Sequence, residues 1–366
     1  MPKKFWNSYK KNNYLYKNHL PKNLLGEELK TESYIKQIQN GKIKMNKLIL
    51  LSCLQIAAIT INAQQTDFSK LTGPYLGQKP PGMMPEIFAP GIVSSEHQEH
   101  SSLSFSPDAK EIWWSRWCLP YDSNKHPQAI MHMTCENGTW RPPQVAPFSG
   151  KYIDGYPTFS PDGQRIYFAS RRPIDEHSQT MPENDIWYVE RIRDGWSRPI
   201  RLGPEVNSSR VDAAPCLAAG GNLYFTSDRM LYPDPTGNYD IFLAASRDGG
   251  FAQATKMGQA INTSDARDAF PFIAPDESYL IFSRDSRRFD AQGREIGGDR
   301  KLMVSFKDNG GTWQEAVDLG PLFANTRFPS VSPDGNYLFF TKYTEGSNED
   351  FYWVSAKIIE ELRPKE

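Results

Sequence analysis

Five segments of this 366-residue chain repeat one another, and this repetition constrains the fold more than any other feature of the sequence. Each segment joins a short apolar run to a tight turn, most often Ser-Pro-Asp-Gly, and an aromatic-rich run follows. The turn positions are Asp108, Asp162, Gly220, Asp276 and Asp334. Successive turns are therefore 54, 58, 56 and 58 residues apart. A regular period of this length indicates units that stack on their neighbours.

Each unit has the pattern of four antiparallel strands. Proline presets φ and Asp-Gly closes a tight turn, so the first two strands form a hairpin. A third strand follows a loop, as at residues 185–188, and a fourth ends in Leu-Gly or Met-Gly, as at Leu202-Gly203. The aromatic content of 13% and the 28 prolines agree with many short strands separated by turns. The sequence therefore predicts an all-β fold, a β-propeller of four-stranded antiparallel blades.

The turn motif followed by an aromatic strand resembles the WD40-like repeats of TolB-type propellers. The resemblance covers residues 100–357. It implies the propeller fold but no single function, because these repeats occur in translocation components, peptidase accessory domains, lyases and many exported proteins of unassigned role. The third repeat departs from the motif, with residues 217–220 reading Leu-Ala-Ala-Gly, and we expect a slightly shorter hairpin there.

The number of blades follows from how the last repeat ends. The fifth repeat reaches its third strand at residues 351–354 and lacks a fourth. Tyr75-Leu76-Gly77 matches the Leu-Gly ending of the other fourth strands, so we expect this N-terminal segment to complete the last blade and close the ring. This predicts five blades. The alternative is six, with extra strands in residues 80–99.

Residues 45–63, MNKLILLSCLQIAAITINA, have the pattern of a secretory signal peptide. Lys47 precedes an apolar run that ends at Ile61, and Ala63 provides a small residue for cleavage. A buried core helix is the alternative interpretation. The run is short for a transmembrane helix, so we expect no transmembrane segment in the mature chain.

These features divide the chain into three parts. Residues 1–44 are an upstream leader that we expect to be absent from the mature protein, residues 45–63 are the signal, and residues 64–366 form a single propeller domain. The mature protein is then periplasmic or secreted. Lipidation through Cys53 is a minor alternative.

Three cysteines remain after the signal: Cys118, Cys135 and Cys216. An odd number leaves at least one thiol unpaired within the chain. Cys118 and Cys135 end antiparallel strands at opposite ends of a blade, beyond bridging distance. We therefore expect no structural disulfide.

Two columns of charged residues recur on the face opposite the turns. Eight residues before each turn, the start of the first strand reads His100, Asp154, Asp212, Asp268 and Thr326. The end of the second strand reads Arg116, Arg171, Arg229, Arg284 and Lys342. Apart from Thr326, these residues are the ligand-binding candidates, together with Arg327 and Trp117, since they would ring one mouth of the channel and recognise a carboxylate, a sugar or a polar peptide. The alternative is that acids and bases pair between neighbouring blades and hold the ring together.

Most tryptophans recur at strand positions and are best explained by packing between blades. They are Trp113, Trp114, Trp140, Trp187, Trp196, Trp313 and Trp353. Trp117 differs, because it lies beyond the predicted strand end beside Arg116. It is the tryptophan that we expect to stack on a sugar ring if the ligand is a glycan.

Signals for a metal or cofactor are weak. His97 and His100 lie close to two glutamates and are the only candidate ligands for zinc or a lyase-type metal. The other histidines are scattered, whereas the oligogalacturonate-type lyases of the propeller superfamily would gather several around the channel. We therefore expect no metal and no other cofactor.

The sequence favours a binding or assembly module over an enzyme. We expect it to recognise a polar ligand at the channel mouth, either a segment of an envelope protein or a glycan. A net charge of −1 gives no case for nucleic acid. No catalytic residue is predicted for a binding module. The alternative is a carbohydrate-active enzyme, a glycosidase or lyase, using Asp154, Asp212 and Asp268 as catalytic carboxylates. Ion pairs between these aspartates and the arginine column would leave that enzyme no free carboxylate.

Overall fold

The computed structural model describes residues 66–117, 128–174, 183–230, 238–286, 298–343 and 349–365, together with the backbone of two short strands between 287 and 298. The leader, the signal, Cys53 and Cys118 lie outside these residues, so the predictions made for them stay predictions. Within the described ranges, no helix is both long enough and apolar enough to cross a membrane. Cys135 and Cys216 are free thiols.

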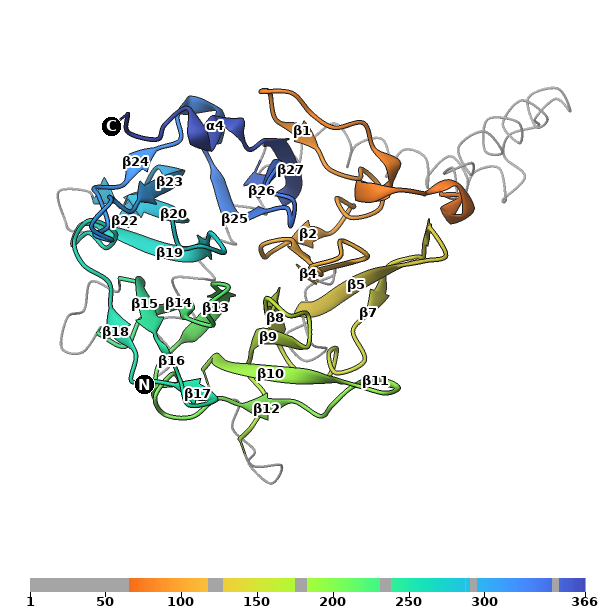
Figure 1. Ribbon diagram of the computed structural model, residues 1–366, viewed down its shortest axis with the longest axis horizontal. Coiled ribbons are helices and arrows are strands. Elements are labelled where there is room, and N and C mark those ends of the chain that lie inside the picture. The colour runs from red at the N-terminus through yellow and green to blue at the C-terminus, as the bar shows by residue number, and fades with distance from the viewer. Residues whose placement is uncertain are drawn as a thin grey trace, which may run out of the picture. The chain divides into compact units, whose positions relative to one another are not determined.

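The described strands form five antiparallel blades around a central axis (Figure 1). Blade 1 contains β2 (Gln98–Glu99) and β3 (Ser104–Phe105) as a split first strand, then β4 (Glu111–Trp117), β5 (Gln128–Glu136) and β7 (Gln144–Val145). Blade 2 contains β8 (Asp154–Phe159), β9 (Arg165–Ser170), β10 (Asp185–Ile192) and β12 (Ile200–Arg201). Blade 3 contains β13 (Asp212–Leu217), β14 (Leu223–Ser227), β15 (Asp240–Ala244) and β18 (Thr255–Lys256).

Blade 4 contains β19 (Ala266–Ile273), β20 (Tyr279–Ser286), β23 (Arg300–Phe306) and β24 (Val317–Asp318). Blade 5 contains β25 (Thr326–Val331), β26 (Tyr337–Tyr343), β27 (Glu349–Ser355) and β1 (Glu86–Ile87). The remaining short strands are β6 (Thr139–Trp140), β11 (Gly195–Trp196), β16 (Ser246–Arg247), β17 (Gly250–Phe251), β21 (Arg288–Phe289) and β22 (Glu295–Gly297). The helical segments are η1 (Phe68–Lys70), η2 (Pro74–Gly77), η3 (Pro321–Phe323) and α4 (Lys357–Glu360).

The first strand of each blade lies nearest the axis, as the positions of β8, β13, β19 and β25 in Figure 1 show. The predicted all-β propeller of five blades is confirmed. Residues 80–99 contain β1 and β2, which belong to blades 5 and 1, so the described chain has no sixth blade.

An N-terminal strand completes the last blade, as predicted, but it is not the segment that the Leu-Gly pattern indicated. The closing strand is β1, whose Glu86 and Ile87 pair with Trp353 and Tyr352 of β27. Tyr75 and Leu76 instead lie in η2 with φ of 51° and 59°, a left-handed conformation that cannot continue a strand ladder. Their buried side chains pack into the junction between blades 5 and 1.

Stacking of the blades buries five apolar clusters among the described residues, one between each pair of neighbouring blades. Alternate residues of a strand face opposite neighbours, because side chains alternate along a strand. In β9, Ile166 and Phe168 pack toward blade 1 and Tyr167 packs toward blade 3. The predicted packing role of the tryptophans is confirmed for Trp113, Trp114, Trp140, Trp187 and Trp353, which are buried in these clusters, and for Trp196 and Trp313, which pack against them.

The hairpin of the third repeat is shorter than the others, as expected. Five residues separate the paired Leu217 and Leu223 of blade 3, whereas six separate Phe159 and Ile166 of blade 2. Gly221 closes the shorter turn with φ of 87°, a conformation that favours glycine.

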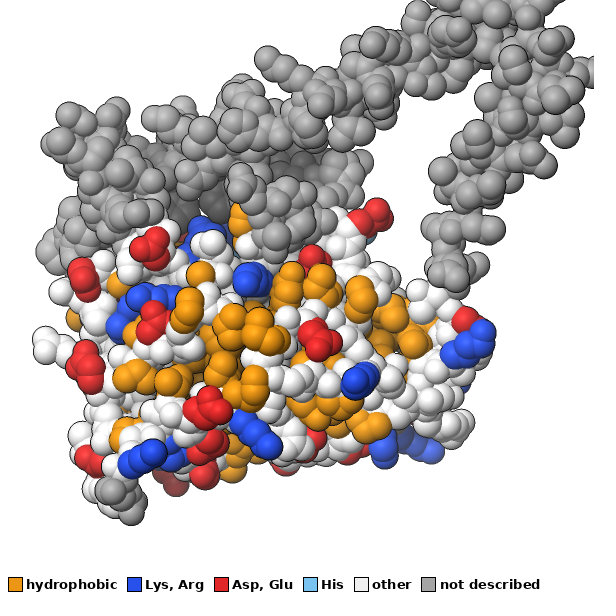
Figure 2. All heavy atoms as spheres, turned by 90° about the horizontal axis from the view of Figure 1, so that it is seen from above, with side chains coloured by type: hydrophobic (Ala, Val, Ile, Leu, Met, Phe, Trp, Pro, Cys, Tyr) orange, Lys and Arg blue, Asp and Glu red, His pale blue; other side chains and the backbone are white. Residues whose placement is uncertain are grey.

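The outermost strands are short and expose single apolar side chains, such as Ile87 on β1 and Val317 on β24. Figure 2, seen from above Figure 1, shows apolar side chains gathered in a band on this side, bordered by acidic and basic ones. Two-residue edge strands flanked by charges limit pairing with other chains.

Ring closure depends on Phe88, which follows β1 and is fully buried against Phe339 and Trp353, with ring centroids 5.1 and 5.2 Å away. We expect Phe88→Ala to lower the free energy of unfolding by about 3–5 kcal/mol because it leaves a cavity at the closing junction. Urea denaturation measures this loss. Ile87→Ala is the control, since Ile87 is 38% exposed, and should cost less than about 1 kcal/mol. Equal losses in both variants would contradict this view of closure.

Candidate functional site

The acidic column lies inside the molecule. Asp154, Asp212 and Asp268 have no exposed surface, and each accepts a hydrogen bond from an arginine. The arginine lies in the same blade as the aspartate, not in a neighbouring blade. The alternative interpretation of the charge columns, that acids and bases pair between neighbouring blades, is therefore wrong for these three aspartates, whose ion pairs form within a blade.

Blade 4 illustrates the arrangement. Arg284 donates through Nε to Asp268 at 2.6 Å, and its Nη2 donates to the carbonyl oxygen of Ile261 at 2.8 Å. Thr263 also donates to Asp268, through its backbone N–H at 2.8 Å and its hydroxyl group at 3.1 Å. Ile261 and Thr263 lie in the segment that arrives from blade 3. The arginine and the aspartate therefore hold the linker between two blades, and we call this arrangement the linker clasp.

The linker clasp recurs in blades 1 to 4. Its acids are Glu99, Asp154, Asp212 and Asp268, and its arginines are Arg116, Arg172, Arg229 and Arg284. The hydroxyl groups of the linkers are those of Ser95, Ser149, Ser208 and Thr263. The carbonyl groups are those of Ile92 and Val93, Phe148, Val206 and Ile261. In blade 5 the acid is replaced by Thr326, which donates to Phe323, and Lys342 donates to Leu322 at 3.3 Å.

In two blades the residue that forms the clasp is one position away from the predicted column member. In blade 2 the clasp uses Arg172, whereas Arg171 pairs with Glu183 at 3.1 Å in an exposed contact. In blade 1 the clasp acid is Glu99 rather than His100. The repeat period predicts which strand ends contribute the two columns, but it does not determine which residue at a strand end turns inward.

Burial affects the charge state of the clasp acids. It raises the pKa of Asp154 and of Asp268, although the partner arginines and hydroxyl groups oppose the rise. Burial likewise raises the pKa of Glu99 to about 7 against the charge of Arg116. The clasp carboxylates are enclosed and hydrogen-bonded, so none of the three aspartates is free to act on a substrate in this structure.

His100 lies near the channel axis. Its Nδ1 is 3.4 Å from the buried carboxylate of Glu349, which also accepts a hydrogen bond from Thr341 at 2.7 Å. Burial alone would raise the pKa of Glu349, but the hydrogen bond and charge of His100 and the charge of Arg327 lower it to about 2. Arg327 itself pairs with Asp285.

Trp117 is the last residue of β4 rather than a residue beyond it, and its ring lies 5.7 Å from that of His100. Among the described residues, no group of three or more His, Cys, Asp or Glu side chains is placed to hold a metal ion, and His97 and His100 form part of none.

Aromatic rings from four blades meet on the axis. Tyr156 of blade 2 stacks on Phe270 of blade 4 at 5.7 Å, and Phe328 of blade 5 lies 4.4 Å from Phe270 and 4.8 Å from His100 of blade 1. Blades 2 and 4 are not neighbours, so their rings can touch only across the channel. Blade 3 contributes the small Ala214 at the same repeat position.

These axial residues have a strained backbone. Tyr156, Ala214, Phe270 and Phe328 have φ between 50° and 58°, and each lies at a register shift of its first strand. A bulge re-aims a side chain, and a non-glycine residue in this conformation costs about 1–3 kcal/mol. The strain thus recurs at this repeat position in blades 2 to 5.

On the turn side of this aromatic cluster, the channel opens as a cavity of about 370 Å³. Its exposed mouth is a ring of one residue per blade: Pro107, Pro161, Ala219, Pro275 and Pro333. A deeper, buried ring consists of Leu103, Pro157, Pro215, Pro271 and Pro329. We call this cavity the turn-face funnel. Proline lacks an N–H and has a fixed φ, so the wall is rigid, mainly apolar and poor in donors.

One polar atom in the funnel wall has no partner. The hydroxyl group of Ser330 is buried, with the residue 6% exposed, and makes no hydrogen bond to any described residue. An apolar pocket with one positioned polar group is typical of a ligand site.

Sequence reasoning placed the candidate site on the opposite face, and it did not single out the residues that the structure brings together in the funnel. A signal for them was present. A proline recurs five residues before the turn in four of the repeats, as at Pro157 and Pro271. Within a sheet, proline is confined to edge strands, strand starts and bulges, and these prolines lie at the bulges of the inner edge strands that border the channel.

No family model matches the chain, and no curated protein matches it. Similar solved structures include a puromycin-hydrolysing peptidase of Mycobacterium tuberculosis, 12% identical with a TM-score of 0.38, over 69% of this chain and 35% of that one. A TolB-like protein from Agrobacterium tumefaciens is 16% identical with a TM-score of 0.35, over 69% and 88% of the two chains.

The GH43 endo-arabinanase from Bacillus licheniformis is 11% identical with a TM-score of 0.40, over 72% and 95% of the two chains. The chain spans about a third of the length of the peptidase. At these identities the likeness concerns the fold alone.

The linker clasp makes a stability prediction. Replacing Arg284 by Met leaves Asp268 buried without its cation and the Ile261 carbonyl group without a donor, so the free energy of unfolding should fall by about 3–5 kcal/mol. Urea denaturation measures the change. Arg247→Met is the matched control, because Arg247 is 74% exposed in its pair with Asp248, and its effect should stay within about 0.5 kcal/mol. A small effect of Arg284→Met would refute a structural role for the clasp.

Proposed function

We propose that this chain is an exported, non-catalytic binding module whose turn-face funnel receives an apolar side chain from a polypeptide segment. The observation that carries the proposal is the funnel itself, an open cavity on the axis with two rigid rings and an unpartnered hydroxyl group in its wall. The ligand is then a segment of another envelope protein.

The geometry favours a polypeptide over a glycan. A sugar is bound mainly through planar polar side chains, and two of those that the sequence analysis assigned to this role, Arg229 and Arg284, are engaged in linker clasps. The funnel wall instead offers apolar surface, which is worth roughly 25 cal/mol per Å² when it is covered. A pre-formed wall loses little entropy on binding.

The proposal that the protein is exported rests on its amino-acid sequence. The apolar run that predicts a signal peptide lies outside the described residues, and periplasmic or secreted localisation is part of the proposal. A binding module outside the cytoplasm fits a rigid scaffold that presents a concave site.

Blocking the mouth tests the proposal. Ala219 is the smallest member of the exposed mouth ring, so Ala219→Trp should cover the funnel without disturbing the core. We expect peptides selected from a random library displayed on phage to bind the wild-type protein and to lose at least tenfold in affinity for Ala219→Trp, measured by isothermal titration.

Ala245→Trp is the control, since Ala245 is also exposed and lies outside the funnel. If the selected peptides bind Ala219→Trp as tightly as they bind the wild type, their binding site lies outside the funnel. A glycan array screened in parallel would support the alternative ligand if it alone gave binding.

Ser330→Ala separates binding from stability. Removing a buried hydroxyl group that has no partner should leave the melting temperature unchanged or raise it. The same change should weaken the selected peptides about fivefold, because a hydrogen bond worth about 1 kcal/mol is lost. Ser246→Ala, at an exposed position outside the funnel, should change neither quantity. A drop in melting temperature without a change in affinity would mean that Ser330 is structural.

A further inference from the structure

The wall of the turn-face funnel carries no charge. None of the described residues that line it is an aspartate, a glutamate, a lysine, an arginine or a histidine. A charged side chain that entered the funnel would lose its water and find no partner of opposite charge, which is strongly unfavourable. The funnel therefore excludes acidic and basic side chains.

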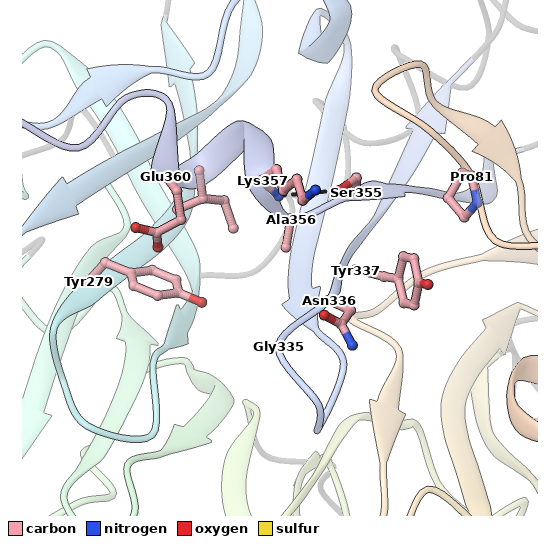
Figure 3. A pocket seen from close by; sticks show the side chains of 10 residues that line it. Pro81, Tyr279, Gly335, Asn336, Tyr337, Ser355, Ala356, Lys357 and Glu360 are labelled. Carbon is pink, nitrogen blue, oxygen red and sulfur yellow. Dashed lines mark hydrogen bonds between the residues drawn. The ribbon is translucent and has the colours of Figure 1, made fainter.

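A second cavity adjoins the funnel between blades 4 and 5. It has a volume of about 410 Å³, and Tyr279 and Gly335 line both cavities. The charged residues that line it are Lys357 and Glu360, and Glu360 accepts two hydrogen bonds from Arg363, at 2.7 and 2.9 Å. Figure 3 shows the hydroxyl group of Tyr279 directed across this second cavity. These charges therefore line the second cavity and not the funnel.

The funnel wall is poor in hydrogen-bond donors. Eight of the residues that line it are prolines, which lack an N–H group but keep a carbonyl acceptor. The hydroxyl groups of Ser102, Ser160 and Ser332 also line the funnel, but each donates to an acceptor within the protein. The wall therefore suits a ligand group that supplies a donor of its own.

Backbone N–H groups of the innermost strands donate to side chains of the preceding blade. Phe159 of blade 2 donates to the hydroxyl oxygen of Ser104 at 3.2 Å, and Ile273 of blade 4 donates to the sulfur of Cys216 at 3.4 Å. The further donors of this kind are Tyr156, Phe270 and Phe328, whose acceptors are Ser115, Thr226 and Ser283. These N–H groups are engaged, so they add no donor to the funnel wall.

Ser330 occupies in blade 5 the repeat position that Ser104 and Cys216 occupy in blades 1 and 3. The blade that follows blade 5 around the ring is blade 1, but the Ser330 hydroxyl group makes no hydrogen bond to any described residue of it. Ser330 is 6% exposed and lines the funnel. Its buried oxygen is therefore an acceptor in the funnel wall that the ring itself does not satisfy.

We infer that the side chain received by the funnel is a tryptophan or a tyrosine, which donates a hydrogen bond to the hydroxyl group of Ser330. The inference rests on the proposed function and names the residue that the ligand inserts. Tryptophan and tyrosine join a large apolar ring to an N–H or O–H donor. Leucine, methionine and phenylalanine lack this donor, and lysine and arginine carry a charge.

Selection from a peptide library tests which side chain enters the funnel. A random dodecapeptide library displayed on phage is selected in parallel on the wild-type protein and on Ala219→Trp. We expect the wild type to enrich peptides that share a tryptophan or a tyrosine at one position. The variant should not enrich them, because its funnel is covered.

Removing only the donor from a selected peptide tests the hydrogen bond on the unaltered protein. A tyrosine is replaced by phenylalanine, or a tryptophan by its benzothiophene analogue, which has sulfur in place of the indole N–H. Isothermal titration should show binding about fivefold weaker, because one hydrogen bond is lost. An unchanged affinity overturns the inference.

A double-mutant cycle identifies the acceptor. Removing the donor from the peptide should not change its affinity for Ser330→Ala, because that variant already lacks the acceptor. The fivefold loss should remain for Ser246→Ala, the matched control, since Ser246 is exposed and lies outside the funnel. A loss that persists in Ser330→Ala overturns the inference.

The selection also separates this inference from the proposed function. Peptides that need an open mouth at Ala219 but insert leucine, methionine or phenylalanine overturn the inference and leave the proposed function intact. Selection of no peptide, or of peptides that bind Ala219→Trp as tightly as the wild type, overturns both.

Discussion

A blade of four strands has two apolar faces, and the structure depends on burying both of them against other blades. Each face is covered only when the ring is complete, because the clusters between blades use alternate residues of the same strands. Blades 5 and 1 are neighbours in space, but the main strands of blade 5, β25 to β27, come last in the chain and blade 1 comes first. Their junction is built from residues near both ends of the propeller, with Phe88 and Tyr75 packed on Phe339 and Trp353.

The linker clasps explain why charges recur in this fold. A linker that arrives from the previous blade carries backbone carbonyl groups that need donors, and an arginine at the end of the second strand supplies them. The arginine in turn needs a buried acid, which the first strand supplies. The pair of Asp212 and Arg229 is one copy of this repeated unit. The recurring charges that suggested a binding mouth therefore satisfy the hydrogen-bonding groups of the linker at each junction. The opposite side of the channel is the one lined by prolines.

The fold was accessible to sequence reasoning because its signals are local and repeated. The turn motif and its spacing predict the blades, and the lack of a fourth strand in the last repeat predicts closure by the N-terminal segment. The identity of that strand was not accessible, because β1 has only two residues and no alternation to mark it. Arg172 was missed for Arg171 because the spacing between the clasp acid and its arginine varies between blades, from 16 residues for Asp268 and Arg284 to 18 for Asp154 and Arg172. The funnel was missed because its residues come together only when the ring forms.

The pairing of β1 with β27 has a consequence for the order in which the molecule assembles. Glu86 pairs with Trp353, and these residues are separated by 353 − 86 = 267 positions. The entropy of closing such a loop grows only with the logarithm of its length, so it costs little more than a loop of half that length, roughly 0.6 kcal/mol. Contacts between distant residues nevertheless form slowly. The N-terminal β1 cannot pair until the C-terminal β27 has been synthesised. Until then the blades form an incomplete ring, and the aromatic side chains on its two open faces are exposed. Completion of the ring is then the step that covers this surface and protects the chain from aggregation.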